Sequence, residues 1–393
     1  MNYRKLFREH KVVRDLSLVQ FIAYFGAWFS NVAIYTMLVE FGSTEMAISI
    51  VTAMHFLPAI LIAPFSGAII DRVKIKPLMV TLLCTELLMT LLFLTINDKS
   101  QIWLLMILIF IRMSAASMFF STEMSLLAKL LNGKPLQMAN EIHSIIWSFT
   151  YAVGMALSGF IVNSFGYKTA FMLDAFVFTL ALIVFIRIDF VVKASITSDK
   201  IMELIKDGFF YIKNNKIMLH LIFLHSCVGL TSFDALITIL AKNEYKYIIS
   251  VPLAIGLSNA VRAVALMIGP STISKYVTKE NLHFLMIFQG ITIIFWGLTQ
   301  SNFYISLVSL FFVGLSTTTL WSFTYALIQN KCDEKYIGRV ISYNDMIFML
   351  SCVLTTLFIG LMASLTSTDI ITILLGEGFL AFAFYYKRIL KWI

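Results

Sequence analysis

Charged residues are scarce in this sequence, and their scarcity excludes an ordinary soluble fold. Only 13% of the 393 residues are Asp, Glu, Lys or Arg, whereas 59% are hydrophobic and the mean hydropathy is +0.87. A soluble domain has about 25% charged and about 45–50% apolar residues. A globule of this size has too little interior for so many apolar side chains, so lipid is the expected surrounding.

Cysteine and catalytic patterns are lacking as well. Of the four cysteines, three fall in apolar runs and Cys332 falls in a charged loop, so none has the spacing of a metal site. The sequence has no H-E-x-x-H pattern and no nucleophile elbow, and Gly133-Lys134 lacks the upstream glycine of a P-loop. These absences argue against an enzyme, against a metal or other cofactor, and against ATP as the driving force.

Long apolar runs stand in place of the missing charge. A helix needs about 20 largely apolar residues to cross a bilayer, whereas barrel strands have about 10 residues of alternating polarity. The runs here have the helical length and do not alternate. We therefore expect an all-α integral membrane protein with twelve transmembrane helices. These helices are expected at residues 16–38, 47–70, 78–96, 101–122, 140–163, 168–188, 217–240, 250–273, 282–300, 303–328, 340–364 and 368–386.

The cations are distributed unevenly between the two sides of these helices. With the N-terminus inside, the inner loops and both termini hold 24 of the 30 Lys and Arg residues. Such a bias sets membrane orientation. It predicts a multi-pass protein of the bacterial inner membrane with both termini in the cytoplasm. It also explains the net charge of +8 without nucleic acid as a partner.

The longest polar stretch separates the first six runs from the last six. Its second half, from Asp199 to Lys216, has Ile205 and Phe209 on one helical face, with Ile201 and Leu204. This pattern predicts an amphipathic helix on the inner leaflet. The expected organisation is an N-terminal six-helix half at 1–188, a cytoplasmic linker at 189–216 and a C-terminal six-helix half at 217–393.

A distinctive loop follows the second apolar run. Gly67 precedes the pair Asp71-Arg72 by four residues, and Lys76 follows. This spacing resembles the G-x-x-x-D-R-x-G-R-K signature of the major facilitator superfamily, although positions 74 and 75 depart from it. The resemblance implies the major facilitator fold, in which two six-helix halves rock about a site near the membrane midplane.

Other segments resemble a narrower group of exporters within that family. Phe56-Leu57-Pro58 and the Pro64-x-x-Gly67 spacing are similar to those of macrolide efflux pumps and the enterobactin exporter, with the bacterial lysophospholipid transporter as a further relative. Gly154 to Gly159 resembles the antiporter motif G-P-x-x-x-G, with Met155 in place of proline. Gly26-Ala27-Trp28 resembles the G-D-W pattern of helix 1 without its acid.

The signature loop predicts a conformational latch. A carboxylate at Asp71 would lie at a cytoplasmic helix end, where it can face the N-terminus of another helix. Arg72 needs an acidic partner at the same depth, and Glu123 has that position. We expect Gly67, Asp71, Arg72, Lys76 and Glu123 to hold the halves in the outward-facing state. The alternative is that the loop cations serve orientation alone.

Ionisable residues inside the apolar runs are costly in lipid and mark functional sites. They are Glu86, Arg112, Asp174, His225, Asp234, Arg262 and Glu377, with His55 in the second run. We expect Asp234 to carry the coupling proton and Arg112 to compete for its ionised form. Glu86 and Glu377 are the next candidates for the carrier.

The family resemblance places helices 1, 4, 7 and 10 around a substrate cavity, and each has polar or aromatic residues at helical spacing. Helix 5 has a similar stripe at Trp147, Tyr151, Gly154 and Ser158, which we interpret as helix packing. The expected cavity residues are Gln20, Tyr24, Trp28, Asn31, Arg112, Thr231, Asp234, Thr318, Trp321 and Tyr325.

These features predict a secondary active transporter that works as a monomer. Its expected partners are the lipid bilayer, the proton and a small-molecule substrate. We expect efflux of an amphipathic drug, macrolide or siderophore by alternating access. A lysophospholipid-type flipping facilitator that needs no proton is the alternative, and an uptake transporter is a further one. A membrane scaffold without transport would not explain the charged residues at depth.

Overall fold

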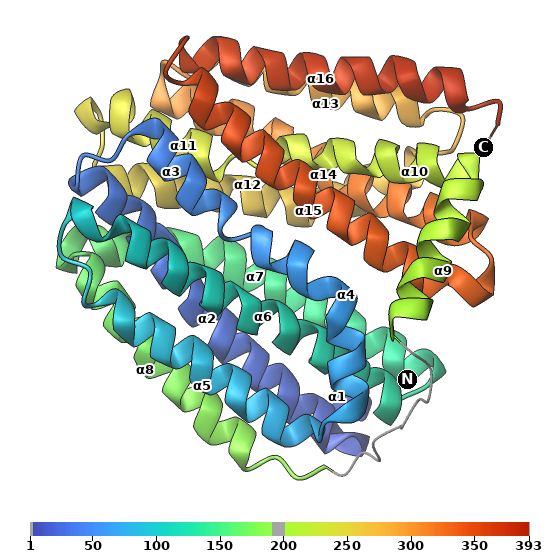
Figure 1. Cartoon of the computed structure of the whole chain (residues 1–393). Coiled ribbons are helices and arrows are strands. Elements are labelled where there is room, and N and C mark those ends of the chain that lie inside the picture. The colour runs from blue at the N-terminus through green and yellow to red at the C-terminus, as the bar shows by residue number, and fades with distance from the viewer. Residues whose placement is uncertain (1–2, 191–200, 393) are drawn as a thin grey trace. The chain divides into compact units, whose positions relative to one another are not determined.

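The computed structural model describes residues 3–190 and 201–392, and the regular elements in those ranges are all helical (Figure 1). Twelve stretches of the described residues are long and apolar enough to cross a membrane. This result confirms the predicted all-α membrane fold. Helices suit lipid because they satisfy their backbone hydrogen bonds within one segment.

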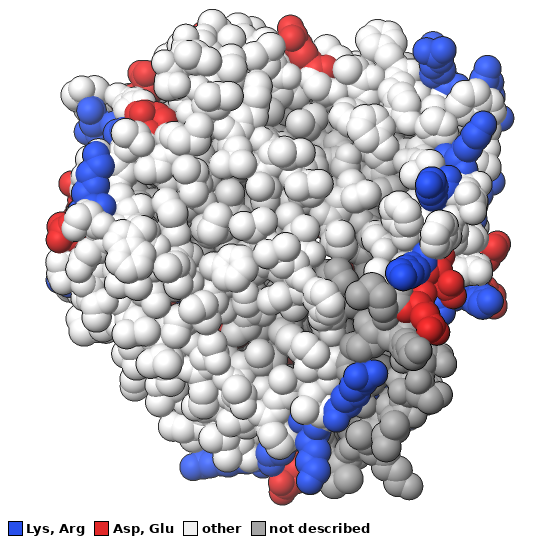
Figure 2. All heavy atoms as spheres, in the orientation of Figure 1, with Lys and Arg blue, Asp and Glu red and all other residues white. Residues whose placement is uncertain are grey.

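Charge is arranged as a membrane-spanning fold requires. Figure 2 shows Lys, Arg, Asp and Glu mainly near the ends of the helices, whereas the visible helix flanks are almost entirely uncharged. Many large apolar side chains on these flanks are exposed, such as Trp103 at 62% and Phe384 at 73%. Exposed apolar flanks of this extent are expected to face hydrocarbon.

The first compact unit comprises Met1–Gly42 and Leu61–Ser198. Within it, α2 packs along α7 and α8, and α5 packs along α6 and α8 (Figure 1). Its core is a continuous apolar cluster that includes Leu16, Met79 and Phe178. The helices that lie wholly or mostly in this unit are α1 (Tyr3–Glu9), α2 (Lys11–Glu40), α4 (Leu57–Arg72), α5 (Ile75–Phe93), η1 (Lys99–Gln101), α6 (Ile102–Leu130), α7 (Gly133–Phe165) and α8 (Tyr167–Ile186).

The second compact unit comprises Ser43–Ile60 and Asp199–Ile393. Within it, α13 packs along α16, α12 along α14, and α3 against α15. Its helices are α3 (Glu45–Ala53), α9 (Ile201–Asn214), α10 (Lys216–Ser226), η2 (Cys227–Thr231), α11 (Asp234–Asn243), η3 (Tyr245–Tyr247), α12 (Val251–Ile273), η4 (Ser274–Tyr276), α13 (Leu282–Thr299), α14 (Phe303–Lys331), η5 (Glu334–Tyr336), α15 (Ile337–Met362) and α16 (Thr368–Ile389).

The second predicted helix is broken, and its first part belongs to the second unit. The helix ends at Ala53 as α3 and resumes at Leu57 as α4. Two contacts hold α3 within the unit. Lys242 forms an ion pair with Glu45 at 2.8 Å, and a Cβ at Gly360 would lie 2.5 Å from the Cβ of Ser49. The compact units therefore differ from the expected halves in the segment Ser43–Ile60.

The linker helix is present as α9 and packs against α15 and α10 of the second unit. Tyr211 stacks on Tyr336 with ring centres 4.3 Å apart, and its hydroxyl accepts a hydrogen bond from the backbone N–H of Asp333. Phe209 and Phe210 remain about half exposed, at 50% and 54%. Exposed rings of this kind are what the predicted contact with the inner leaflet requires. Residues 199–200, and the side chains of Ile201 and Leu204, lie outside the described residues.

The seventh predicted helix, expected as one element over 217–240, is also broken. The α-helix ends at Ser226, a 3₁₀ turn follows, and α11 begins at Asp234. Gly229 permits close packing there, because a Cβ at that position would lie 2.5 Å from the hydroxyl of Ser351 on α15. Ser232 is hydrogen bonded to Thr356 on the same helix at 3.2 Å.

Membrane orientation can be tested with single cysteines at exposed loop positions. The native Cys332 is a poor reporter because it is only 9% exposed. We expect Glu334→Cys, in a variant with the four native cysteines replaced by serine, to react with a membrane-impermeant maleimide only in inside-out vesicles. The control Tyr247→Cys, at a position 81% exposed, should react only in intact cells. The opposite labelling of both would reverse the predicted orientation.

Candidate functional site

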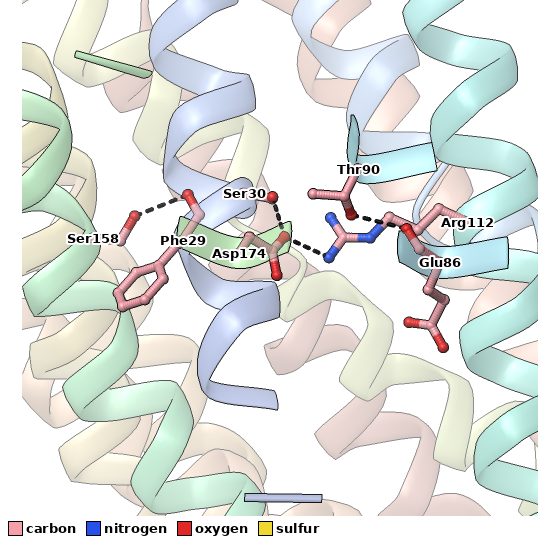
Figure 3. A network of polar contacts seen from close by, with 7 residues as sticks. All are labelled: Phe29, Ser30, Glu86, Thr90, Arg112, Ser158 and Asp174. Atoms are coloured by element: carbon pink, nitrogen blue, oxygen red, sulfur yellow. Dashed lines mark hydrogen bonds and ion pairs between the residues drawn. The ribbon is translucent and has the colours of Figure 1, made fainter. Parts of the chain in front are cut away.

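A buried ion pair joins two helices of the first unit. The Nη2 atom of Arg112 on α6 lies 2.7 Å from Oδ2 of Asp174 on α8, and the two residues are 6% and 0% exposed. The hydroxyl of Ser30 on α2 donates a hydrogen bond to the same carboxylate oxygen (Figure 3). Three helices of the unit therefore meet at one carboxylate.

The surroundings of this ion pair are tightly packed. The guanidinium carbon of Arg112 lies 5.6 Å from the ring centre of Phe93 and 5.5 Å from that of Phe178. Gly26 leaves room for the carboxylate, because a Cβ there would lie 2.7 Å from Oδ1 of Asp174. That oxygen has no hydrogen-bond partner among the described residues. The glycine of the Gly26-Ala27-Trp28 pattern thus serves the packing around a buried charge.

A second acid lies beside the pair. Glu86 on α5 is 7% exposed, and it interacts electrostatically with both Arg112 and Asp174. Its backbone carbonyl accepts a hydrogen bond from Thr90 (Figure 3), but no described residue forms an ion pair or hydrogen bond with its carboxylate. In this cluster one cation therefore lies within electrostatic range of two acids, and it is paired with one of them.

Another polar cluster lies farther along α6. Glu123 is 2% exposed, and its Oε2 accepts a hydrogen bond from the Gln20 side chain at 2.9 Å. The same amide nitrogen also contacts Nδ1 of His143 on α7. Tyr24 lies edge-on to His143 at 5.9 Å and feels the charges of both Glu123 and Glu86. Tyr24 thereby links the two clusters of acids electrostatically.

The signature residues only partly adopt the expected arrangement. Arg72, the last residue of α4, is exposed, and Lys76 forms an ion pair with an exposed aspartate beyond α8 at 3.5 Å. Among the described residues no ion pair joins Arg72 to Glu123, because Glu123 is buried and hydrogen bonded elsewhere. The surroundings of Gly67 and the side chain of Asp71 lie outside the described part of the structure.

The polar stripe of helix 5 packs against helix 1. The rings of Trp28 and Tyr151 lie 4.5 Å apart, and a Cβ at Gly154 would lie 2.9 Å from the Trp28 side chain. Ser158 donates a hydrogen bond to the backbone carbonyl of Phe29 at 3.0 Å. These contacts agree with the packing interpretation of the stripe. Trp28, which we expected to line a cavity, is held between these residues and is half-buried.

In the second unit, Asp234 lies just after the break of helix 7. It is half-buried and is the first residue of α11, where the helix dipole favours a negative charge. Arg262 on α12 donates a hydrogen bond to the backbone carbonyl of Thr231 at 2.8 Å, and the thiol of Cys352 feels the charges of Arg262 and Asp234. Arg262 is thus the basic residue near Asp234 within its own unit.

The two aromatic residues expected on helix 10 lie together. Trp321 and Tyr325 stack with ring centres 4.8 Å apart. His225 on α10 is 0% exposed, lies edge-on to both rings, and has its Nδ1 hydrogen bonded to Thr324 at 2.8 Å. Its Nε2 has no partner among the described residues. Because helix 7 is broken between them, His225 and Asp234 lie on separate helices, α10 and α11.

The remaining candidates have varied surroundings. Asn31 and Thr318 are half-buried, whereas Glu377 on α16 is exposed. The sequence analysis overlooked Asp345, which lies eight residues after the start of α15. Its position inside a predicted apolar run could have identified it as a further ionisable candidate. Within the described part of the chain, no group of three or more His, Cys, Asp or Glu could hold a metal ion.

Breaking the Arg112–Asp174 pair should destabilise the protein. Arg112→Gln leaves the buried carboxylate without its cation, and we expect a loss of about 3–5 kcal/mol in the free energy of unfolding. Asp174→Asn should cost a similar amount, and the double variant should lose clearly less than the sum of the two. Thermal unfolding in detergent measures these changes. The control Glu9→Gln, in an exposed i,i+4 pair, should change nothing measurable. Additive losses would contradict the coupling.

Comparisons with known proteins identify the family. The family model described as Major Facilitator Superfamily matches residues 16–385. The uncharacterized MFS-type transporter YfiS of Bacillus subtilis (strain 168) is 26% identical over 222 residues, which are 55% of this chain and 52% of that protein. The match thus spans about half the length of the curated relative.

Solved structures share the fold at much lower identity. Two crystal structures of the nucleoside transporter NupG, one of them a point mutant, superpose with TM-scores of 0.76 and 0.74. They are 11% and 12% identical and cover 97% and 96% of this chain, with 99% of each NupG chain covered. At this identity the likeness concerns the fold alone. Because the family model matches nearly the whole chain, the protein belongs to the major facilitator superfamily, and its twelve candidate spans make it a multi-pass membrane protein.

Proposed function

We propose that the protein exports an amphipathic small molecule in exchange for protons by alternating access. The observation that carries this proposal is the buried cluster of Arg112, Asp174 and Glu86, in which one cation faces two acids. The exporter direction is supported by the resemblance of the signature loop and its flanking prolines to efflux proteins.

The charge balance of this cluster explains why a proton would be involved. With both acids ionised, the cluster would have a net charge of −1 in tightly packed surroundings. An uncompensated buried charge costs several kcal/mol. The cluster is therefore expected to hold one proton while it is closed and to release it when an acid gains water or a new partner. A conformational change that alters these contacts would couple proton transfer to transport.

The second acidic cluster offers a route for this proton. Arg112 and Glu123 lie eleven residues apart on α6, or roughly 16 Å at 1.5 Å per residue. Tyr24 lies in the electrostatic field of Glu123 and Glu86. Gln20 hydrogen bonds to Glu123 and contacts His143, whose imidazole can take up and release a proton. We propose that Glu123, Tyr24 and Glu86 form a path between the cytoplasmic end of the first unit and the ion pair.

Asp234 remains a second candidate for the proton carrier. It is a half-buried acid within a membrane span, directly after a helix break. Broken helices form ion and substrate sites in other transporters. We favour Glu86 because Asp234 lies at a helix N-terminus, where its negative charge is already favoured.

The proton proposal can be tested in proteoliposomes. We expect Glu86→Gln to abolish the dependence of ethidium transport on an imposed pH gradient, because an amide keeps the shape of the acid but cannot carry its proton. Exchange of ethidium without a gradient should persist. Glu377→Gln, at an exposed acid of α16, is the matched control and should retain the dependence.

Each other result of this assay has a defined meaning. Loss of the dependence in Asp234→Asn, but not in Glu86→Gln, would move the carrier to the second unit. A wild-type protein that moves labelled lysolipid with no effect of pH would favour the flipping facilitator. Inward transport of nucleosides, the substrate class named for NupG, would favour uptake.

The latch remains a separate proposal based on the signature loop. We expect Asp71→Asn to insert and fold normally but to lose transport, because the amide removes the negative charge from the loop. Insertion is measured by membrane yield, and transport by the ethidium assay. Because Glu123 contacts Gln20 rather than Arg72, simultaneous charge reversal of Arg72 and Glu123 should not restore activity. Full transport activity of the Asp71→Asn variant would contradict the latch proposal.

A further inference from the structure

We propose that the second unit carries a binding site for a lipophilic organic cation, formed by Asp345 and the stacked rings of Trp321 and Tyr325. This inference specifies the substrate class and rests on the proposed export function for its biological role. Three elements contribute to the site. The acid is on α15, the two rings are on α14, and the buried His225 behind them is on α10.

The acid lies within a candidate membrane span and has no cation of its own. Asp345 is about 12 Å from the start of α15 at 1.5 Å per residue, and it is half-buried. Its carboxylate accepts only a weak hydrogen bond from Asn344 at 3.3 Å. The nearby Arg339 forms its ion pair with Asp207 instead. No ion pair to Asp345 occurs among the described residues, so a bound cation would neutralise a charge that is costly at this depth.

The rings provide a surface that favours a cation. Trp321 and Tyr325 are four residues apart on α14 and therefore lie on one face of it. Trp321 is 36% exposed, and Tyr325 is half-buried and feels the charge of Asp345. Phe348 lies one turn beyond the acid on α15 and contacts His225, with ring centres 5.5 Å apart. Aromatic faces attract organic cations, most strongly when water is excluded.

Two buried polar atoms lack partners, one in the histidine that contacts the rings and one in the residue that precedes Asp345. The Nε2 atom of His225 and the Oδ1 atom of Asn344 have no hydrogen-bond partner in the described part of the chain. Both residues are 0% exposed. Buried polar atoms without partners are uncommon and call for an explanation. A protonated amine bound beside the rings would bring N–H donors for such acceptors, whereas a quaternary cation would rely on the acid and the aromatic faces alone.

These groups together select a particular substrate chemistry. The acid favours a positive charge and repels an anion, while the rings of Trp321, Tyr325 and Phe348 favour apolar substituents around that charge. The matching ligand is an amine or quaternary cation with aromatic or branched apolar groups. Within the amphipathic class proposed above, the site therefore favours cationic molecules over neutral ones and excludes anionic ones.

Equilibrium dialysis on the full-length protein in nanodiscs tests the site, with tetraphenylphosphonium as the cation and triphenylphosphine oxide as a neutral analogue. We expect Asp345→Asn to weaken tetraphenylphosphonium binding by about tenfold or more and to leave the neutral compound unaffected. Asp333→Asn, at an exposed acid just before α15, is the matched control and should bind like the wild type.

The rings are tested separately from the charge. Trp321→Leu should weaken cation binding, whereas Trp321→Phe should retain most of it because it keeps an aromatic face. Asp345→Glu preserves the charge and should preserve binding, which guards against a folding defect in the asparagine variant. Equal affinity of wild type and Asp345→Asn, or no preference of the wild type for the cation, would overturn the proposal.

Transport separates this inference from the exporter proposal. If tetraphenylphosphonium binds in an Asp345-dependent manner but no pH gradient drives its movement in proteoliposomes, the site stands and the exporter proposal fails. If the wild type exports triphenylphosphine oxide against its gradient but binds no cation, the exporter proposal stands and the site fails.

Discussion

A charge placed among membrane helices must be paired or neutralised, and this constraint organises the first unit. Arg112 is countered by Asp174, the carboxylate is approached by Ser30, and Gly26 makes space for it. The helices that carry these residues are thereby fixed against one another by a charged centre as well as by apolar packing. Glu86 adds a second acid beside the single guanidinium of Arg112, and this imbalance of charge is the basis of the proton proposal.

The second unit meets a related constraint at its backbone. Polar backbone groups at membrane depth need partners, and helix 7 exposes several where it breaks. Arg262 donates to the backbone carbonyl of Thr231. A hydrogen bond between the side-chain hydroxyls of Ser232 and Thr356 also joins the broken segment to α15. Gly229 lets the broken segment approach α15 closely. The break places Asp234 at a helix N-terminus, which a continuous helix would not do.

The two units therefore differ in the chemistry they present. The first has a cation with surplus acids, arranged in contacts that would change when a proton binds or leaves. The second has aromatic rings, an acid without a cation, and buried polar atoms without partners. The proposals made for the two units are consistent with each other, because the first unit would bind the proton and the second the cationic molecule.

The sequence by itself predicted that the protein lies in a membrane, that it is all-helical with twelve spans, and that it belongs to the major facilitator superfamily. These follow from run length, hydropathy and one loop signature, which are local properties along the chain. It also identified the ionisable residues inside the apolar runs, among them Arg112, Asp174 and Glu86, which are buried in the structure. Only the tertiary structure decided their partners, because spacing along one helix does not reveal which neighbouring helix a side chain meets. Arg112 was expected to act on Asp234 and is paired with Asp174. Helices 2 and 7 were expected to be continuous, although Pro58 and Gly229 lie at their breaks as local signals.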